Sequence, residues 1–133
     1  MIEKIDHIGI AVHSIDDAQK FYSKALGLPI GGRERLESQG VELAFIQVGE
    51  SRIELLQPLS PDTPIGKFLD KKGQGMHHIA LKVDDIDASL AKLKEEGARL
   101  IDQEPRPGAH GTKVAFCHPR STFGVLLELV QEE

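Results

Sequence analysis

Several features that mark particular protein classes are scarce or missing in this sequence of 133 residues. Cys117 is the one cysteine, so the chain cannot form an internal disulfide, and we expect the protein to lie in a reducing compartment, the cytoplasm. Tryptophan is absent and aromatic residues make up 5%, which argues against a stacking platform for bases or planar drugs. The first residues, MIEKIDHIGI, carry charges within their apolar stretch, unlike a signal peptide. No apolar run approaches the roughly 20 residues that a membrane span needs.

Excess positive charge is also missing. The formal net charge is −5, which argues against a nucleic-acid-binding surface. The apolar content of 40% and the charged content of 28% are ordinary for a globular protein, and the length suits one compact domain over residues 1–133.

The most informative feature is an internal repeat. Residues 7–12 (HIGIAV) resemble residues 78–83 (HIALKV), and two dipeptides, Ile-Asp and Ala-Phe, recur at the same offset of 71. Residues 54–57 (ELLQ) recur at an offset of 74 as residues 128–131 (ELVQ), which fits a longer loop near residues 119–124. We therefore predict two copies of one module, about residues 1–57 and 74–131, joined by a linker with a short helix at 58–73.

Each copy predicts the same order of elements. An alternating strand opens the copy, and a helix follows it that ends at Gly27 in the first copy and at Gly97 in the second. Ser14 is the expected N-cap of the first helix. The pattern predicts an α+β fold of two paired βαβββ modules. The remaining expected elements are strands at 30–35, 41–48, 52–56, 99–102, 113–118 and 125–130, and helices at 65–70 and 86–96.

Polar residues recur at strand positions where burial of an apolar residue would cost less free energy. His7 and His78 open the equivalent first strands, and Glu54 and Glu128 lie between apolar neighbours in the equivalent last strands. Alternation puts each of them on the face opposite the Ile, Leu and Val rows. A carboxylate in such a strand must be exposed, paired or coordinated.

These four residues predict one divalent metal site. Any single one is more simply interpreted as a solvated strand carboxylate or a structural histidine. Their recurrence at repeated positions favours a shared site to which each copy gives one His and one Glu. Two imidazoles and two carboxylates suit Co²⁺, Ni²⁺, Mn²⁺, Fe²⁺ or Zn²⁺.

The motifs around these residues resemble the vicinal oxygen chelate superfamily, and within it the methylmalonyl-CoA epimerase family. The likeness covers nearly the whole chain. It rests on residues 6–12 (DHIGIAV), 53–58 (IELLQP), 63–65 (TPI), 75–80 (GMHHIA), 108–111 (GAHG), 116–119 (FCHP) and 124–129 (GVLLEL). The resemblance implies a glyoxalase-like domain whose two modules form a curved sheet around a metal cavity.

The resemblance also implies an activity, which is epimerisation of methylmalonyl-CoA at C2 through a metal-stabilised enolate. Inversion needs a base on each face of that planar intermediate, and we assign these roles to Glu54 and Glu128, which also serve as metal ligands. The expected metal is Co²⁺, with Zn²⁺, Ni²⁺ or Mn²⁺ as alternatives. The resemblance further implies a place in propionate metabolism and, by analogy, a homodimer.

One position departs from some of these epimerases, which carry a glutamate base in the third strand and glutamine at the Glu54 position. An ungapped comparison puts Leu43 at that base position here, with Glu42 one residue away on the opposite face. Either a small shift brings Glu42 in, or Glu54 acts as the base. We favour Glu54, because a strand slip of one residue would expose every core side chain.

Other polar residues have weaker assignments. His110, Gly111 and Lys113 flank a glycine loop that is a candidate binding site for the substrate carboxylate or the CoA phosphates, with an ordinary surface hairpin as the alternative. His77 is expected to point away from the metal and to be structural or to support a ligand. His13 is expected to be solvated.

Two other functions remain open from the sequence. Glyoxalase I would use the same four ligands on a hemithioacetal substrate. A metal-free binding or drug-sequestering protein on the same fold belongs to a different class.

Overall fold

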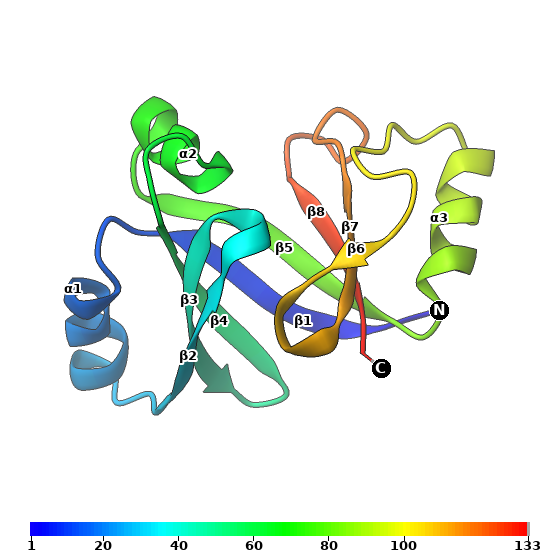
Figure 1. Cartoon of the computed structure of the whole chain (residues 1–133). Helices are drawn as coiled ribbons and strands as arrows, with labels where there is room; N and C mark the ends of the chain where they lie inside the picture. Colours follow the sequence, from blue (N-terminus) through cyan, green and yellow to red (C-terminus); the bar gives the residue numbers. More distant parts are fainter. Residues whose placement is uncertain (133) are drawn as a thin grey trace. The chain divides into compact units, whose positions relative to one another are not determined.

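The fold consists of eight strands and three α-helices with short 3-10 and π-helical segments (Figure 1). The structure is a computed structural model, and it describes residues 1–132. The strands are β1 (Ile2–Ala11), β2 (Ile30–Leu36), β3 (Val41–Val48), β4 (Ser51–Pro58), β5 (Gly75–Val83), β6 (Arg106–Pro107), β7 (Lys113–Cys117) and β8 (Leu127–Gln131). The helices are α1 (Ile15–Gln19), continued as a π-helix over Lys20–Ala25, α2 (Pro64–Lys72) and α3 (Ile86–Glu95), with 3-10 turns at Glu37–Gln39 and Ala109–Gly111. In the described part of the chain, no helix has both the length and the apolar character to cross a membrane.

The chain divides into two compact units. One unit consists of residues 7–77, and its strands have the hydrogen-bonded order β2-β3-β4-β1. The other consists of residues 1–6 and 78–132, and its order is β1-β5-β8-β7-β6. Strand β1 contributes its first residues to one unit and the rest to the other.

The pairing within the units confirms the repeat. In one unit β1 runs parallel to β4, and β4 runs antiparallel to β3. In the other, β5 runs parallel to β8, and β8 runs antiparallel to β7. The registers are also equivalent, because Gly9 lies opposite Glu54 and Ala80 lies opposite Glu128. The predicted α+β fold of two βαβββ modules is thus confirmed.

The two repeated helices begin in the same way. Ser14 is the N-cap of α1, as predicted, and its side chain accepts a hydrogen bond from the Asp17 N–H. Asp85 is the N-cap of α3, and its side chain accepts from the Ala88 N–H. A glutamine from the last strand of each module accepts a second hydrogen bond from the start of the helix. Gln57 Oε1 accepts from the Ile15 N–H at 2.8 Å, and Gln131 Oε1 accepts from the Ile86 N–H at 2.7 Å. The Gln that ends each ELLQ-like motif therefore ties the strand to the start of its helix.

Each unit packs its helix on one face of its strands. One core cluster consists of Val12, Ile15, Ala44, Ile46 and Leu55. The equivalent cluster in the other unit consists of Val83, Ile86, Leu90, Ala115 and Leu129. Burial of these side chains from water fixes the helix-facing side of each strand. The opposite side of β1, β4, β5 and β8 is the one that carries the predicted site residues.

The prediction was wrong for one strand of the second module. Residues 99–102 form only a single bridge, Leu100 to Cys117, and the short strand β6 comes later, at Arg106–Pro107. The N–H groups of Ile101 and Asp102 both donate to the same carbonyl of Phe116, so the antiparallel pairing does not continue beyond this bridge. Asp102 Oδ2 then accepts from the Phe116 N–H at 2.8 Å. These contacts replace the regular ladder that the strand pattern predicted.

Smaller differences concern boundaries. Strand β8 begins at Leu127 and not at 125, because residues 119–124 form a series of turns that ends at Gly124, with a φ of 98°. The helix predicted at 65–70 extends over Pro64–Lys72, with Thr63 as its N-cap. Such shifts of one or two residues are usual at the ends of elements.

Candidate functional site

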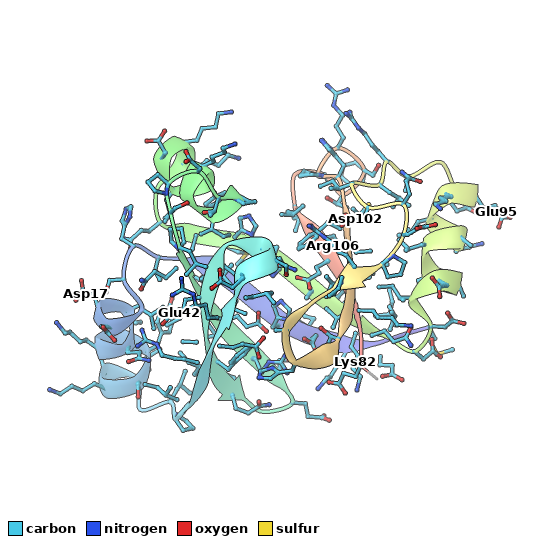
Figure 2. All side chains as sticks on the ribbon, in the orientation of Figure 1. Asp17, Glu42, Lys82, Glu95, Asp102 and Arg106 are labelled. Atoms are coloured by element: carbon cyan, nitrogen blue, oxygen red, sulfur yellow. The ribbon has the colours of Figure 1, made fainter. Side chains whose placement is uncertain are left out.

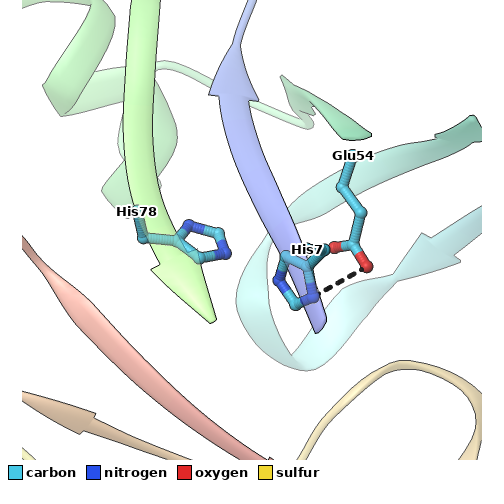
Figure 3. Close-up of side chains that lie close together, drawn as sticks. All are labelled: His7, Glu54 and His78. Carbon is cyan, nitrogen blue, oxygen red and sulfur yellow. Dashed lines mark ion pairs between the residues drawn. The ribbon is translucent and has the colours of Figure 1, made fainter. Parts of the chain in front are cut away.

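The unit of residues 7–77 buries one imidazole next to one carboxylate. His7 lies on β1 and Glu54 on the adjacent parallel strand β4, and they are 4% and 5% exposed. The Nδ1 atom of His7 is 3.3 Å from Oε2 of Glu54, the ion pair drawn as a dashed line in Figure 3. Both side chains leave the strands on the face away from the α1 core, as the alternation predicted.

The other unit repeats this arrangement. His78 lies on β5 and Glu128 on the parallel strand β8, and they are 5% and 6% exposed. The Nε2 atom of His78 is 3.0 Å from Oε1 of Glu128. The ring of His78 also contacts the edge of Phe116, with 5.7 Å between the ring centroids. The structure thus brings the four predicted residues together as two buried pairs, one in each unit.

The donor set of these residues fits a divalent metal ion. Buried carboxylates are costly unless they are paired or coordinated, and imidazole with carboxylate is a typical ligand combination for borderline divalent ions. His7 and Glu54 offer such donors in one unit, and His78 and Glu128 offer the same pair of donors in the other. The residues opposite the carboxylates on the neighbouring strands are small, Gly9 beside Glu54 and Ala80 beside Glu128.

Arg52 is a site residue that the sequence reasoning missed. Its Nη2 atom donates to Glu54 Oε2 at 3.2 Å, and its guanidinium carbon lies over the ring of Phe45, 5.8 Å from the centroid. Arg52 precedes Glu54 by two residues on the same strand, so parity alone places both side chains on one face. That spacing could have identified it.

A buried carboxylate next to the site was also missed. Asp6 is 1% exposed and immediately precedes His7. The sequence offered little to single it out, because an Asp near the start of a strand is ordinarily solvated.

The structure places Glu42 on the face opposite Glu54. Its neighbours on that face, Ala44 and Ile46, belong to the α1 core. Glu42 Oε2 is 3.3 Å from Arg33 Nε, and Arg33 also pairs with Asp16 of α1 at 3.1 Å (Glu42 is labelled in Figure 2).

Leu43 takes the other face of β3. It is 4% exposed and lies opposite Leu56 of β4, which shares the parity of Glu54. The orientation inferred from strand parity is therefore found for both Leu43 and Glu42.

The candidate substrate loop lies between β6 and β7. His110 and Gly111 are in the exposed 3-10 turn, and Lys113 is the exposed first residue of β7. His110 has a φ of 57°, in the left-handed region that non-glycine residues rarely adopt. Glycine would adopt this conformation with less backbone strain. Strained residues of this kind often lie at functional sites.

The remaining histidines and the cysteine take structural or solvated positions. His77 packs against Phe68 of α2 in a T-shaped arrangement, with centroids 4.9 Å apart. His13 is exposed, as expected. Burial raises the pKa of the Cys117 thiol, so this residue stays protonated near neutral pH and is a poor nucleophile.

Comparison with known proteins supports the motif-based assignment. Residues 6–116 match the family model of the Glyoxalase/Bleomycin resistance protein/Dioxygenase superfamily. The chain is 40% identical over 129 residues to the mitochondrial methylmalonyl-CoA epimerase of Bos taurus, covering 96% of this chain and 74% of the relative. It is 41% identical to the ethylmalonyl-CoA/methylmalonyl-CoA epimerase of Cereibacter sphaeroides, covering 98% of this chain and 99% of the relative.

Solved structures agree with this likeness. A methylmalonyl-CoA epimerase in complex with methylmalonyl-CoA and NH4+ superposes with a TM-score of 0.95 at 39% identity, covering 99% of this chain and 96% of that one. The predicted glyoxalase-like fold is confirmed. The chain therefore belongs to the Glyoxalase/Bleomycin resistance protein/Dioxygenase superfamily, and within it to the methylmalonyl-CoA epimerase family.

Proposed function

We propose that this protein interconverts the R and S forms of methylmalonyl-CoA at C2. The observation that carries the proposal is the pair of buried imidazole–carboxylate groups at equivalent places in two repeated modules, in a chain about 40% identical to named epimerases over nearly its full length. Inversion requires two bases, and the repeat offers two carboxylates at equivalent positions of its modules.

We further propose that His7, Glu54, His78 and Glu128 hold one divalent metal ion, with Co²⁺ as the expected ion. The burial of all four side chains and the imidazole–carboxylate pair in each unit support this proposal. A bound divalent ion would act as a Lewis acid that stabilises negative charge on the substrate oxygens. This role fits the substrate, because its C2 proton lies between a thioester carbonyl and a carboxylate.

The two glutamates have the proton-transfer roles in this proposal. One carboxylate takes the proton from C2, and the other returns a proton to the opposite face of the planar intermediate. Glu42 is not assigned a role, because its carboxylate faces Arg33 and α1. The assignment of Glu54 as the second base thus agrees with the orientation of the two candidate side chains.

The loop of His110, Gly111 and Lys113 is proposed to bind the anionic parts of the substrate. The support is its exposure, its positive charge at Lys113 and the strained backbone of His110. Backbone N–H groups in such a turn, together with a lysine, suit a carboxylate or a phosphate.

A homodimer in the cytoplasm completes the proposal. Gel filtration with light scattering tests the oligomeric state, and a mass near twice 14.6 kDa for the chain is expected. A monomeric mass would reject the dimer without affecting the proposed chemistry.

The direct test of function is an assay of the purified protein with each substrate. We expect it to interconvert the two methylmalonyl-CoA isomers after loading with Co²⁺, and to form no lactoylglutathione from the hemithioacetal of glutathione and methylglyoxal. Lactoylglutathione formation without epimerisation would identify the protein as a glyoxalase I. No tight metal and no activity with added Co²⁺ would favour a binding protein.

A further inference from the structure

Arg52 and His7 contact the same carboxylate oxygen. Glu54 Oε2 accepts a hydrogen bond from Arg52 Nη2 at 3.2 Å and lies 3.3 Å from His7 Nδ1. Arg52 is also the cross-strand partner of His7 in the parallel β1–β4 ladder. The guanidinium and the imidazole therefore define the position of one of the two oxygens of Glu54.

The guanidinium is itself held in place. It lies over the ring of Phe45, and Phe45 is the antiparallel cross-strand partner of Glu54 on β3. The side chain of Arg52 is 26% exposed, so its charge is screened by water only in part. A cation that is stacked on an aromatic ring and bonded to a carboxylate has little freedom to move.

At the equivalent sequence position, the second module has no arginine. The residue two places before Glu128 is Leu126. An arginine does lie over the equivalent phenylalanine: Arg106 is 5.2 Å from the centroid of Phe116. However, Arg106 comes from β6, and its Nε pairs with Asp102 at 3.4 Å (both are labelled in Figure 2). The two modules thus repeat the glutamate but not the arginine two residues before it.

We propose that Arg52 is a positioning residue for the carboxylate of Glu54. By binding Oε2, it fixes the orientation of this carboxylate toward the proposed metal ion and the substrate proton, and it offsets the charge of the carboxylate. The inference rests on the proposed function for the role of Glu54, but the Arg52–Glu54 coupling itself does not depend on a metal.

The first test therefore measures that coupling in metal-free protein. Unfolding by urea is followed for the wild type, Arg52→Met, Glu54→Gln and the double variant. We expect the double variant to lose less stability than the sum of the two single losses, because the second substitution removes a partner that is already missing. Arg35→Met is the matched control, since Arg35 forms an exposed ion pair with Glu37 at 2.8 Å, away from the site.

The second test measures the affinity and the visible spectrum of bound Co²⁺. The spectrum depends on the metal ligands, so it reports a change at the Glu54 carboxylate. Loss of a nearby cation favours a dication, so Arg52→Met should bind Co²⁺ about three- to tenfold more tightly, with an altered spectrum. With the carboxylate no longer fixed, kcat should fall about 10-fold or more while KM changes less. Arg52→Lys keeps the charge and one donor, so its Co²⁺ affinity should lie closer to that of the wild type than to that of Arg52→Met. Arg35→Met should match the wild type in Co²⁺ affinity and in kcat.

The outcomes separate this inference from the proposed function. Additive stability losses, or a Co²⁺ affinity and spectrum in Arg52→Met that equal those of the wild type, would overturn the role of Arg52. A wild type that binds no Co²⁺ would reject the proposed metal site, and the unfolding measurements would still decide whether Arg52 and Glu54 are coupled.

Discussion

The carboxylate of Glu42 lies 3.3 Å from the Nε atom of Arg33 on the neighbouring strand. This ion pair keeps Glu42 on the α1 side of β3, and bringing its carboxylate to the other side would require a slip that reverses every side chain of the strand. Leu43 takes the face that Glu54 shares, so a second base has to come from elsewhere.

The two candidate bases can be separated by matched substitutions. Glu42→Gln should retain epimerase activity within about twofold of the wild type, because its carboxylate is not at the site. Glu54→Gln should lower kcat by about 10²- to 10⁴-fold, the usual effect of removing a general base. A coupled assay with methylmalonyl-CoA measures both. If Glu42→Gln were as inactive as Glu54→Gln, the assignment of the second base would be wrong.

Metal binding should depend on the buried histidines and not on the exposed one. His7→Ala should lower Co²⁺ affinity by at least about 10-fold, since losing a ligand should cost no less than losing an outer partner. His13→Ala, at an exposed position of the same unit, should bind Co²⁺ as the wild type does. Competition with a chromophoric chelator measures the affinities. Equal affinities in the two variants would exclude His7 as a ligand.

Metal should also stabilise the fold, because an ion that binds only the native state shifts the unfolding equilibrium. Free Co²⁺ at 100 times its dissociation constant should add about 2.7 kcal/mol to the free energy of unfolding. Thermal denaturation with and without a chelator reports this shift. An unchanged melting temperature in the wild type would contradict a tight native site.

The glutamines that contact the helix starts should contribute to stability. Gln57→Leu removes the acceptor of the Ile15 N–H and should cost about 1 kcal/mol or more, because that donor loses its partner. Gln57→Glu keeps an acceptor and places a negative charge at the start of a helix, so it should cost less. Urea unfolding compares them, with Gln131→Leu as the equivalent change in the other module. Equal losses for Leu and Glu at position 57 would mean that the bond has no stabilising role.

The loop between β6 and β7 should affect substrate binding more than proton transfer. Lys113→Ala should raise KM several-fold with a smaller change in kcat, because an exposed cation contributes to binding a phosphate or carboxylate without touching C2. Lys71→Ala, an exposed lysine of α2, is the control. A KM that is unchanged in Lys113→Ala would leave the loop as an ordinary surface hairpin.

The repeat explains why so much of the fold could be predicted. Each match at the offsets of 71 and 74 predicts one element in both modules. Strand alternation alone predicts the face on which His7 and Glu54 lie. The parity of Glu42 and Leu43 followed from the same rule. Strand parity and helix capping are local properties of the chain, so the sequence carries them directly.

The errors and omissions come from tertiary contacts. Residues 99–102 have a strand-like pattern, but two of their N–H groups converge on the carbonyl of Phe116, which no local pattern indicates. An arginine on a strand is ordinarily solvated, and only the contact with Glu54 reveals another role for Arg52. The burial of Asp6 likewise depends on packing that the sequence does not show.

The central claim is that Glu54 and Glu128 act as two bases on opposite faces of one planar intermediate. Proton exchange at C2 in D₂O tests it most directly, with Co²⁺-loaded Glu54→Gln and Glu128→Gln and each separate isomer of methylmalonyl-CoA. The account predicts that neither variant interconverts the isomers at an appreciable rate, and that each exchanges the C2 proton of one isomer only, the opposite isomer in the two cases. Exchange of both isomers by Glu54→Gln with its metal still bound would contradict the account.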